Sequence, residues 1–382
     1  MSEPRVAFLI HGLVVGGAEK FFISLVNHFY RSGHNPLVIL LSDQNALFGE
    51  MDPGVETVII KRKYKYDLKV GRQIKEVLEK HQADRVFTVG IFSFFLMKLY
   101  FLGDRSKTFF LSLHSTIPRT TKEHLCNYVY FRFISDRDRV LFICHAQKEY
   151  LRKKYGFSPA RSSVIYNGID TKKFILCGQP GEPSQQELKA KYGIKPDEKV
   201  IVKIARMFRE KGHRYGIDAL SVLHSKHSIK GHLFFVGSGD DQYLHEMQDY
   251  AKKSPVASYI HFIEHQKDVR PYYCMGDLFT LTSYTTETFS LAALEAMSSG
   301  RPCSLTNIGG AEEMINENTG TLSQSKNPES IADSWANILR KSYDPLSLHD
   351  YVESNFSLPG MISQYENAVL PARQFKKELV VQ

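Results

Sequence analysis

Two glutamates eight residues apart are the residues best suited to chemistry. Glu287 and Glu295 belong to the stretch 283–302, which follows a strand-like apolar run. Glu287 falls at a predicted helix start, and Glu295 lies about two turns further along, so both can face the same elongated ligand. The free backbone N–H groups of such a helix start would attract a phosphate. These groups belong to Phe289, Ser290 and Leu291. Two glutamates at this spacing are also common on ordinary helix surfaces.

Two cations follow another strand-like run. Arg206 and Lys211 lie in a loop after the apolar segment 199–204. An arginine can make a forked contact to a diphosphate, and a lysine can act as a point charge beside it. A pair that neutralises a departing diphosphate would replace a metal ion in that role. A solvated basic loop is the other interpretation of the same pattern.

A glycine pair and a histidine lie at predicted strand ends in the first half of the chain. Gly16 and Gly17 connect the apolar run 6–10 to a helical pattern, and glycines there let the backbone approach a phosphate or a sugar closely. Their spacing is neither that of the dinucleotide fingerprint nor that of a P-loop. His114 follows the apolar run 108–113. A lone histidine in such a place is more often structural than catalytic.

Two series of strands and helices are needed to position these residues. The strands predicted in the first half span 6–10, 36–41, 57–60, 85–89, 108–113, 140–144 and 163–166. Those predicted in the second half span 199–204, 232–236, 260–263, 277–282 and 302–305. Helical spacing of apolar residues marks segments between them, among them 18–31, 69–81, 215–227 and 291–299. This alternation predicts an α/β protein whose halves are each doubly wound and Rossmann-like.

The length of 382 residues exceeds what one hydrophobic core usually serves. We predict an N-terminal domain over 1–171, a linker rich in glycine, proline and serine over 172–195, and a C-terminal domain over 196–354. A C-terminal helix at about 355–382 is expected to cross back onto the first domain. Because open parallel sheets bind ligands at the carboxyl ends of their strands, the candidate residues should line the cleft between the domains.

The ordered set of motifs resembles the retaining GT-B glycosyltransferases, in particular glycosyltransferase family 4. The two-glutamate stretch is followed by Gly300-Arg-Pro302 and Gly309-Gly310-Ala-Glu-Glu313, and the resemblance extends to 16–19, 164–170, 206–211 and 236–239. It implies the GT-B fold, with two Rossmann-like domains facing across a cleft. It also implies a transferase that moves a hexose or N-acetylhexosamine from a UDP- or GDP-sugar to a glycan or lipid-linked acceptor, with retention of configuration. Family members of this kind act in bacterial lipopolysaccharide or capsule synthesis.

The resemblance also implies roles for the candidate residues. Arg206 and Lys211 would hold the donor diphosphate, with Gly16, Gly17 and the N–H groups of Phe289, Ser290 and Leu291 beside it. Glu295 would accept from the ribose hydroxyls, Glu287 would contact the donor sugar, and His114 is similar to the family's active-site histidine. No metal and no other cofactor is implied. The chain has Glu287-Thr-Phe-Ser290 where the family often has Glu-Gly-Phe-Gly, and it lacks the usual glycine at 262–265, which leaves the nucleotide base open.

The net charge of +8 is unevenly distributed, with +9 on residues 1–170 and −1 on residues 171–382. A basic half fits anionic lipid headgroups or an anionic acceptor, although it also fits a solvated face. No nucleic-acid-binding module is readable, so nucleic acid is not an expected partner. The five cysteines are scattered singly, which favours free thiols and a cytoplasmic protein, peripheral on the inner face of the membrane.

Other functions fit parts of the pattern. A catalytically inactive sugar-nucleotide-binding or scaffold protein of the same fold is the main alternative. An epimerase or a phosphorylase could share a two-domain cleft, but no acid and histidine pattern supports the first and no marked cofactor lysine supports the second. Asp136-Arg-Asp138 matches a metal-binding D-x-D pattern, but its charged surroundings favour a solvated turn.

Overall fold

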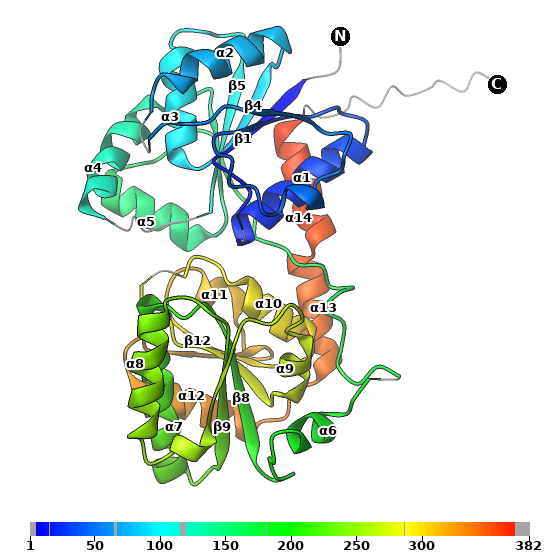
Figure 1. The fold of residues 1–382 in the computed structure, drawn as a ribbon, viewed down its shortest axis with the longest axis vertical. Coiled ribbons are helices and arrows are strands. Elements are labelled where there is room, and N and C mark those ends of the chain that lie inside the picture. The colour runs from blue at the N-terminus through cyan, green and yellow to red at the C-terminus, as the bar shows by residue number, and fades with distance from the viewer. Residues whose placement is uncertain are drawn as a thin grey trace, which may run out of the picture.

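The computed structural model describes residues 5–14, 16–64, 67–114, 120–180, 182–285 and 287–370. They form two α/β domains, one above the other in Figure 1, each with a parallel sheet between helices. The first sheet contains β1 (Val6–Ile10), β2 (Leu37–Leu40), β3 (Glu56–Ile59), β4 (Arg85–Val89), β5 (Thr108–Leu113), β6 (Arg139–Phe142) and β7 (Ser162–Val164). Its helices include α1 (Gly17–Arg31), α2 (Val70–Lys80), α3 (Ile91–Tyr100), α4 (Thr121–Tyr130) and α5 (His145–Tyr155).

The second sheet contains β8 (Lys199–Ile204), β9 (Gly231–Val236), β10 (Ile260–Ile263), β11 (Leu278–Leu281), β12 (Cys303–Thr306) and β13 (Gly320–Ser323). The helices of this half are α6 (Gln185–Ala190), α7 (His213–His227), α8 (Asp241–Lys252), α9 (Arg270–Met275), α10 (Leu291–Ser298), α11 (Ala311–Met314) and α12 (Pro328–Arg340). Two further helices, α13 (Pro345–Phe356) and α14 (Leu358–Val369), complete the described chain.

Both sheets reverse their strand order beside a central strand. The first has the order β3-β2-β1-β4-β5-β6-β7 and the second β10-β9-β8-β11-β12-β13. The reversals fall between β1 and β4 and between β8 and β11. Open α/β sheets bind ligands at such points, outside the carboxyl ends of the strands.

The central strands are mostly apolar because helices cover both faces of each sheet. In β1 every residue is buried. Ala7 and Leu9 belong to the core on one face, together with residues of α2 and α3, whereas Phe8 and its alternate neighbours belong to the core on the other face. The prediction of an α/β fold with two Rossmann-like domains is therefore confirmed, and the predicted strands lie within two residues of the observed ones.

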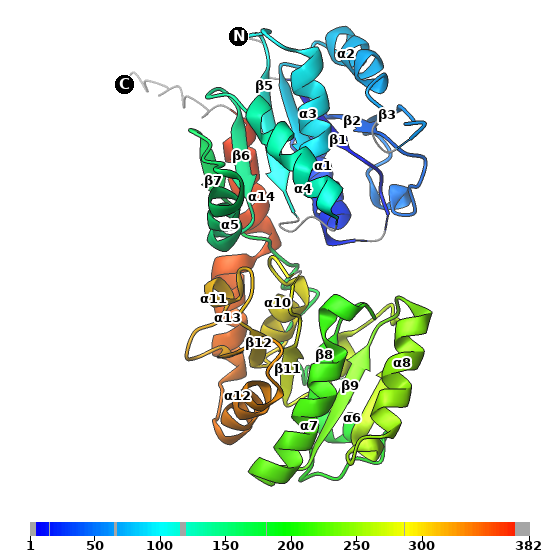
Figure 2. The same ribbon diagram turned by 90° about the vertical axis from the view of Figure 1, so that its left-hand side faces the viewer.

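The chain crosses between the domains twice, and the two crossings lie side by side. After β7, Ile169 pairs with Ser357, which separates α13 from α14. A Cβ atom on Gly168 would lie 2.5 Å from the carbonyl oxygen of Ser357, so glycine allows the close approach. Figures 1 and 2 show α13 against the second domain and α14 against the first. Met361 and Tyr365 of α14 belong to the first domain's core on the face of the sheet that contains Phe8.

The segment 172–195, predicted as a linker, contains α6, whose Leu188 packs in the core of the second domain. It also contains Cys177, which forms a disulfide with Cys274 of α9. The expectation that all five cysteines are free thiols is therefore wrong. The partners are 97 positions apart in the sequence, and the segment before α6 is brought to α9 by Arg270, which donates to the carbonyl oxygen of Leu176. The free cysteines are Cys126, Cys144 and Cys303.

The apolar stretch 87–102 contains the end of β4 and the whole of α3. Within the described residues, no helix combines the length and the apolar character that crossing a bilayer requires. Of the predicted C-terminal helix at 355–382, residues 371–382 lie outside the described part of the chain.

Candidate functional site

Lys211 and Glu287 form an ion pair at the point where the strand order of the second sheet reverses. Lys211 Nζ lies 2.9 Å from Glu287 Oε2, and the side chains are only 13% and 21% exposed. Lys211 follows β8 and precedes Gly212, whose φ of +65° and proximity to Thr282 exclude a larger residue. Glu287 follows β11, and the hydroxyl of Ser283 donates to it over 3.3 Å. The two strand ends therefore deliver a cation and a carboxylate to one place.

A second lysine lies beneath this pair. Lys203 of β8 is fully buried, and its Nζ donates to the hydroxyl oxygen of Thr282 over 2.6 Å and to the carbonyl oxygen of Lys211. Burial, together with the charge of Lys211, lowers the pKa of Lys203 well below its ordinary value. Lys203 thus supports the backbone of the loop that carries Lys211. Sequence reasoning missed this residue, although a lysine within an otherwise apolar central strand is a signal that it needs buried partners.

Arg206 is exposed and lies over the ring of Phe208, with its Cζ 5.0 Å from the ring centroid. Its charge reaches the first turn of α1. Burial raises the pKa of Glu19, and a hydrogen bond to its own N–H and the charge of Arg206 oppose that rise. Arg206 therefore lies close enough to the start of α1 for its charge to act on Glu19.

Glu295 of α10 is held by a tyrosine that sequence reasoning also missed. The hydroxyl of Tyr273 donates to Glu295 Oε2 over 2.8 Å. Burial raises the pKa of Glu295, while Tyr273 and the nearby charges of Lys20 and Lys173 oppose the rise. Since Lys20 belongs to α1, Glu295 also lies near the start of the first domain's first helix.

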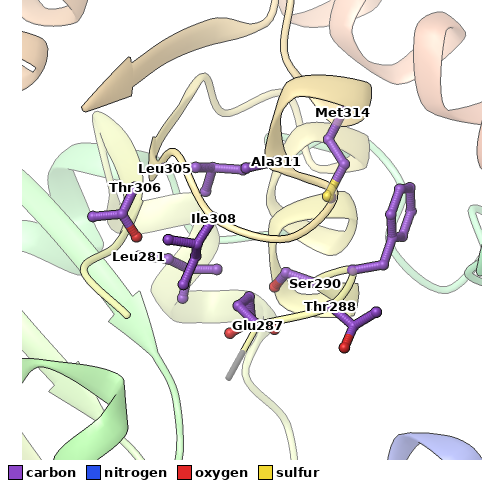
Figure 3. Close-up of a pocket in the computed structure, with 10 residues that line it drawn as sticks. Leu281, Glu287, Thr288, Ser290, Leu305, Thr306, Ile308, Ala311 and Met314 are labelled. Atoms are coloured by element: carbon purple, nitrogen blue, oxygen red, sulfur yellow. The ribbon is translucent and has the colours of Figure 1, made fainter. Parts of the chain in front are cut away.

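The predicted helix 291–299 is confirmed, although Glu287 lies in the loop before it and not at the helix start itself. The helix α10 begins at Leu291, and the hydroxyl of Ser290 caps it by accepting from the N–H of Ala293 over 3.3 Å. Serine is a strong N-cap residue, so the helix starts after it and leaves Glu287 in the preceding loop. Figure 3 shows Glu287, Thr288 and Ser290 beside a cavity of about 10 Å³. This cavity has room for about one water molecule, so a sugar ring does not fit in it.

The glycine pair lies at the domain boundary. Gly16 is the N-cap of α1 and Gly17 is its first residue. A Cβ atom on Gly17 would lie 3.2 Å from Cδ1 of Leu291, so the start of α1 closely approaches the start of α10. The structure therefore brings the predicted glycine loop and the predicted phosphate-facing helix start together.

His114 lies just after β5. Its ring centroid is 4.4 Å from that of Phe21, and its Nε2 atom is 3.0 Å from the hydroxyl oxygen of Ser112. Burial lowers the pKa of His114 to about 4, so its ring is neutral at neutral pH. These contacts come from α1 and β5, so His114 lies within the first domain.

The D-x-D pattern has a structural role. Asp138 is buried and accepts from the N–H and the hydroxyl of Ser135 over 2.7 and 2.8 Å, and it pairs with Lys98. In the part of the chain that the structure describes, no group of three or more His, Cys, Asp or Glu side chains is arranged to hold a metal ion.

Two parallel-sheet domains, with Lys211 and Glu287 paired at strand ends of the second, have the architecture of a GT-B protein. Comparison with family models gives the same result for each domain. The model described as Glycosyltransferase Family 4 matches residues 15–173, and that of Glycosyl transferases group 1 matches residues 184–354. The two models together cover most of the chain, which belongs to the group 1 glycosyltransferases of glycosyltransferase family 4.

Several individual proteins are similar to this chain. Spore coat protein SA of Bacillus subtilis is 23% identical over 378 residues, which are 92% of this chain and 95% of that protein. The N-acetyl-alpha-D-glucosaminyl L-malate synthase of Bacillus anthracis is 27% identical over 212 residues, or 53% of this chain and 52% of that protein. An uncharacterised glycosyltransferase of Methanocaldococcus jannaschii is 29% identical, and the match likewise spans about half of its length, at 49%.

Two solved structures show the same fold over nearly the whole chain. A glycosyltransferase of Rickettsia africae has a TM-score of 0.78 at 20% identity and covers 97% of this chain and 98% of its own. Anabaena HepE in complex with UDP has a TM-score of 0.79 at 17% identity and covers 95% of this chain and 99% of its own.

Proposed function

We propose that this protein is a retaining glycosyltransferase that uses no metal ion. It moves a hexose or N-acetylhexosamine from a UDP- or GDP-sugar to a glycan or lipid-linked acceptor in bacterial cell-surface polysaccharide synthesis. The observation that carries the proposal is the Lys211–Glu287 pair at the reversal of the second sheet. Arg206 lies in the same segment after β8 as Lys211, and Glu295 lies on α10, the helix that follows the Glu287 loop. Family membership and the fold shared with a UDP complex support a nucleotide-sugar donor.

The positive groups of the site suit a departing nucleoside diphosphate. Negative charge grows on the diphosphate as its bond to the sugar breaks, and preorganised cations and N–H groups stabilise that charge. Arg206 and Lys211 supply the cations. The start of α10, near Phe289 and Ser290, supplies backbone N–H groups. The buried contact of Lys203 to the Lys211 carbonyl holds the loop that presents Lys211.

The two carboxylates suit the two ends of the donor. Tyr273 donates to Oε2 of Glu295, which leaves Oε1 and the second lone pair of Oε2 to accept from the ribose hydroxyls. Glu287 accepts from hydroxyls of the transferred sugar, while the Lys211 ammonium that it pairs with turns to the phosphate. His114, neutral at neutral pH, provides a hydrogen-bonding group on the opposite domain. The acceptor hydroxyl then attacks from the face that the diphosphate leaves, and the departing phosphate takes its proton.

An anionic membrane surface is the place we propose for the acceptor. On α4, the apolar side chains of Leu125, Tyr128 and Val129 are 64%, 46% and 53% exposed. Their spacing places them on one face of the helix. Exposed Lys122 and Arg132 lie at the two ends of this stripe, within the half of the chain that carries the positive charge. Apolar side chains flanked by cations suit an interface with anionic lipid headgroups.

Calorimetric titration with UDP-, GDP-, ADP- and TDP-sugars tests the donor proposal. We expect one nucleotide class to bind, and Arg206→Ala and Glu295→Ala each to weaken that binding. A folded protein that binds none of these sugars would instead be a scaffold with an inactive cleft.

A further inference from the structure

Glu313 of α11 connects the second domain to a helix of the first. Its Oε2 atom accepts from the N–H of His145 over 2.8 Å, and its Oε1 atom accepts from the N–H of Ala146 over 2.8 Å. These are the first two residues of α5, whose free N–H groups attract negative charge. The side chain of Cys144 accepts from the next N–H group, that of Gln147, over 3.4 Å. The start of a first-domain helix is thus capped by a carboxylate of the second domain, and Figure 1 shows α5 and α11 on facing sides of the domain boundary.

The same carboxylate connects to an aromatic contact across the boundary. The hydroxyl of Tyr166 donates to Glu313 Oε2 over 3.0 Å. Its ring stacks on that of Phe289 with 5.2 Å between centroids. Burial and the hydrogen bond to Glu313 raise the pKa of Tyr166 to about 12, so the hydroxyl keeps its proton and remains a donor.

The loop that carries Glu287 packs closely against the start of α11, the helix that carries Glu313. The N–H of Gly310 donates to the carbonyl oxygen of Thr288 over 2.8 Å, and the thiol of Cys144 reaches the same oxygen at 3.5 Å. A Cβ atom on Gly309, which has a φ of +57°, would lie 1.8 Å from the carbonyl oxygen of Glu287. The start of α11 and the loop 287–290 are therefore packed against each other with no space for a side chain between them.

We propose that Glu313 is a positioning residue that latches the two domains together and thereby orders the loop 287–290 for the donor. A carboxylate suits this role because it accepts from three donors at once, and a glutamine would turn an NH₂ group toward one of them. The latch consists of a few polar contacts and one ring stack, so it can open and close, while the paired crossings at Ile169 and Ser357 keep the domains connected. The statement about the donor rests on the proposed function, whereas the domain contact does not.

Hydrogen exchange of the full chain tests the latch with three proteins: wild type, Glu313→Gln and Glu312→Gln. Glu312 is the matched control because it is the exposed neighbour on α11 and accepts from Asn307 of its own domain. Without ligand, we expect Glu313→Gln to speed exchange at His145 and Ala146 by about tenfold or more and to speed exchange of the peptide 287–291 as well. Tyr166→Phe, which keeps the ring stack, should have a smaller effect at both places.

If the start of α5 and the peptide 287–291 exchange in Glu313→Gln at the wild-type rate, the proposed latch is wrong. Faster exchange at the start of α5 alone would show that Glu313 is only a helix cap and would overturn its positioning role. UDP then serves as the probe of the donor site. We expect UDP to protect the peptide 287–291 in the wild type and in Glu312→Gln, but less in Glu313→Gln. No protection by UDP or by any other nucleotide in the wild type would contradict the proposed function, while the ligand-free data would still decide on the latch.

Discussion

The hydroxyl of Tyr273 donates a 2.8 Å hydrogen bond to Glu295, so one carboxylate oxygen is fixed before any ligand binds. Tyr273 lies on α9 and is almost fully buried, while Glu295 lies on α10 at the domain boundary. Burial of Glu295 favours its protonated form, and the bond from Tyr273 favours the carboxylate. Tyr273 therefore orients the Glu295 carboxylate and favours its charged form. We propose that this carboxylate binds ribose.

Tyr273→Phe should weaken nucleotide binding about fivefold, because it removes one hydrogen bond to the carboxylate worth about 1 kcal/mol. Calorimetric titration with the nucleotide that the wild type binds measures the change. Tyr272→Phe is the matched control, since the hydroxyl of Tyr272 contacts that of Tyr192 away from Glu295. Equal affinities of the two variants would contradict the role of Tyr273.

Lys203→Met should weaken diphosphate binding about tenfold while the protein remains folded. The substitution removes the donor to the Lys211 carbonyl oxygen, so the loop that presents Lys211 loses its support, but methionine keeps most of the apolar volume. Titration with the nucleoside diphosphate gives the affinity, and thermal unfolding reports the stability. Lys199→Met, on the same strand but only half-buried, is the control and should bind as the wild type does. Unchanged affinity in Lys203→Met would refute the supporting role.

The sequence predicts best those elements whose own residues form a clear pattern along the chain. The strands at the sheet centres are rich in apolar residues, so their positions could be predicted, whereas the edge strand β13 is a short Gly-Thr-Leu-Ser segment with no such pattern. The start of α10 at Leu291 could be predicted from the apolar spacing of 291–299, and Ser290, a strong cap, explains why the helix does not extend back to Glu287. The Cys177–Cys274 pair and the Tyr273–Glu295 contact join distant segments, and nothing in the spacing of a single sequence reveals them.

Glu287→Gln should separate nucleotide binding from sugar transfer. The substitution removes a negative charge that pairs with Lys211 and would repel a phosphate, so affinity for the free nucleoside diphosphate should stay equal or rise. The rate of donor turnover should fall about a hundredfold, because the contact to the sugar is lost. Titration and a donor-hydrolysis assay measure the two quantities. Glu329→Gln, exposed on α12, controls for the loss of one negative charge. A parallel loss of both quantities would contradict the assignment of Glu287 to the sugar.

Stability should depend on pH through His114. Burial lowers the pKa of His114 from 6.5 to about 4. Between these values the unfolded chain binds a proton that the folded chain does not bind, so the free energy of unfolding falls as the pH drops from 6.5 to about 4. The full contribution is about 3 kcal/mol. In His114→Asn this part of the pH dependence should flatten, as measured by chemical denaturation at a series of pH values. The control is His245→Asn, a substitution of an exposed histidine on α8, which should retain the wild-type slope. Equal slopes in both variants would show that His114 is not the group responsible.

Leu125→Ser should reduce binding to anionic vesicles if the α4 stripe contacts a membrane. Leu125 is 64% exposed within the basic half of the chain, so its burial in lipid would add apolar contact to an attraction that salt screens. Cosedimentation with phosphatidylglycerol vesicles, at low and high salt, gives the binding, and phosphatidylcholine vesicles measure the contribution of charge. Leu346→Ser is the matched control, because Leu346 is similarly exposed, at 54%, but lies on α13 against the second domain. Equal loss in the two variants would place the contact elsewhere, and salt-independent binding would exclude headgroup charge as its cause.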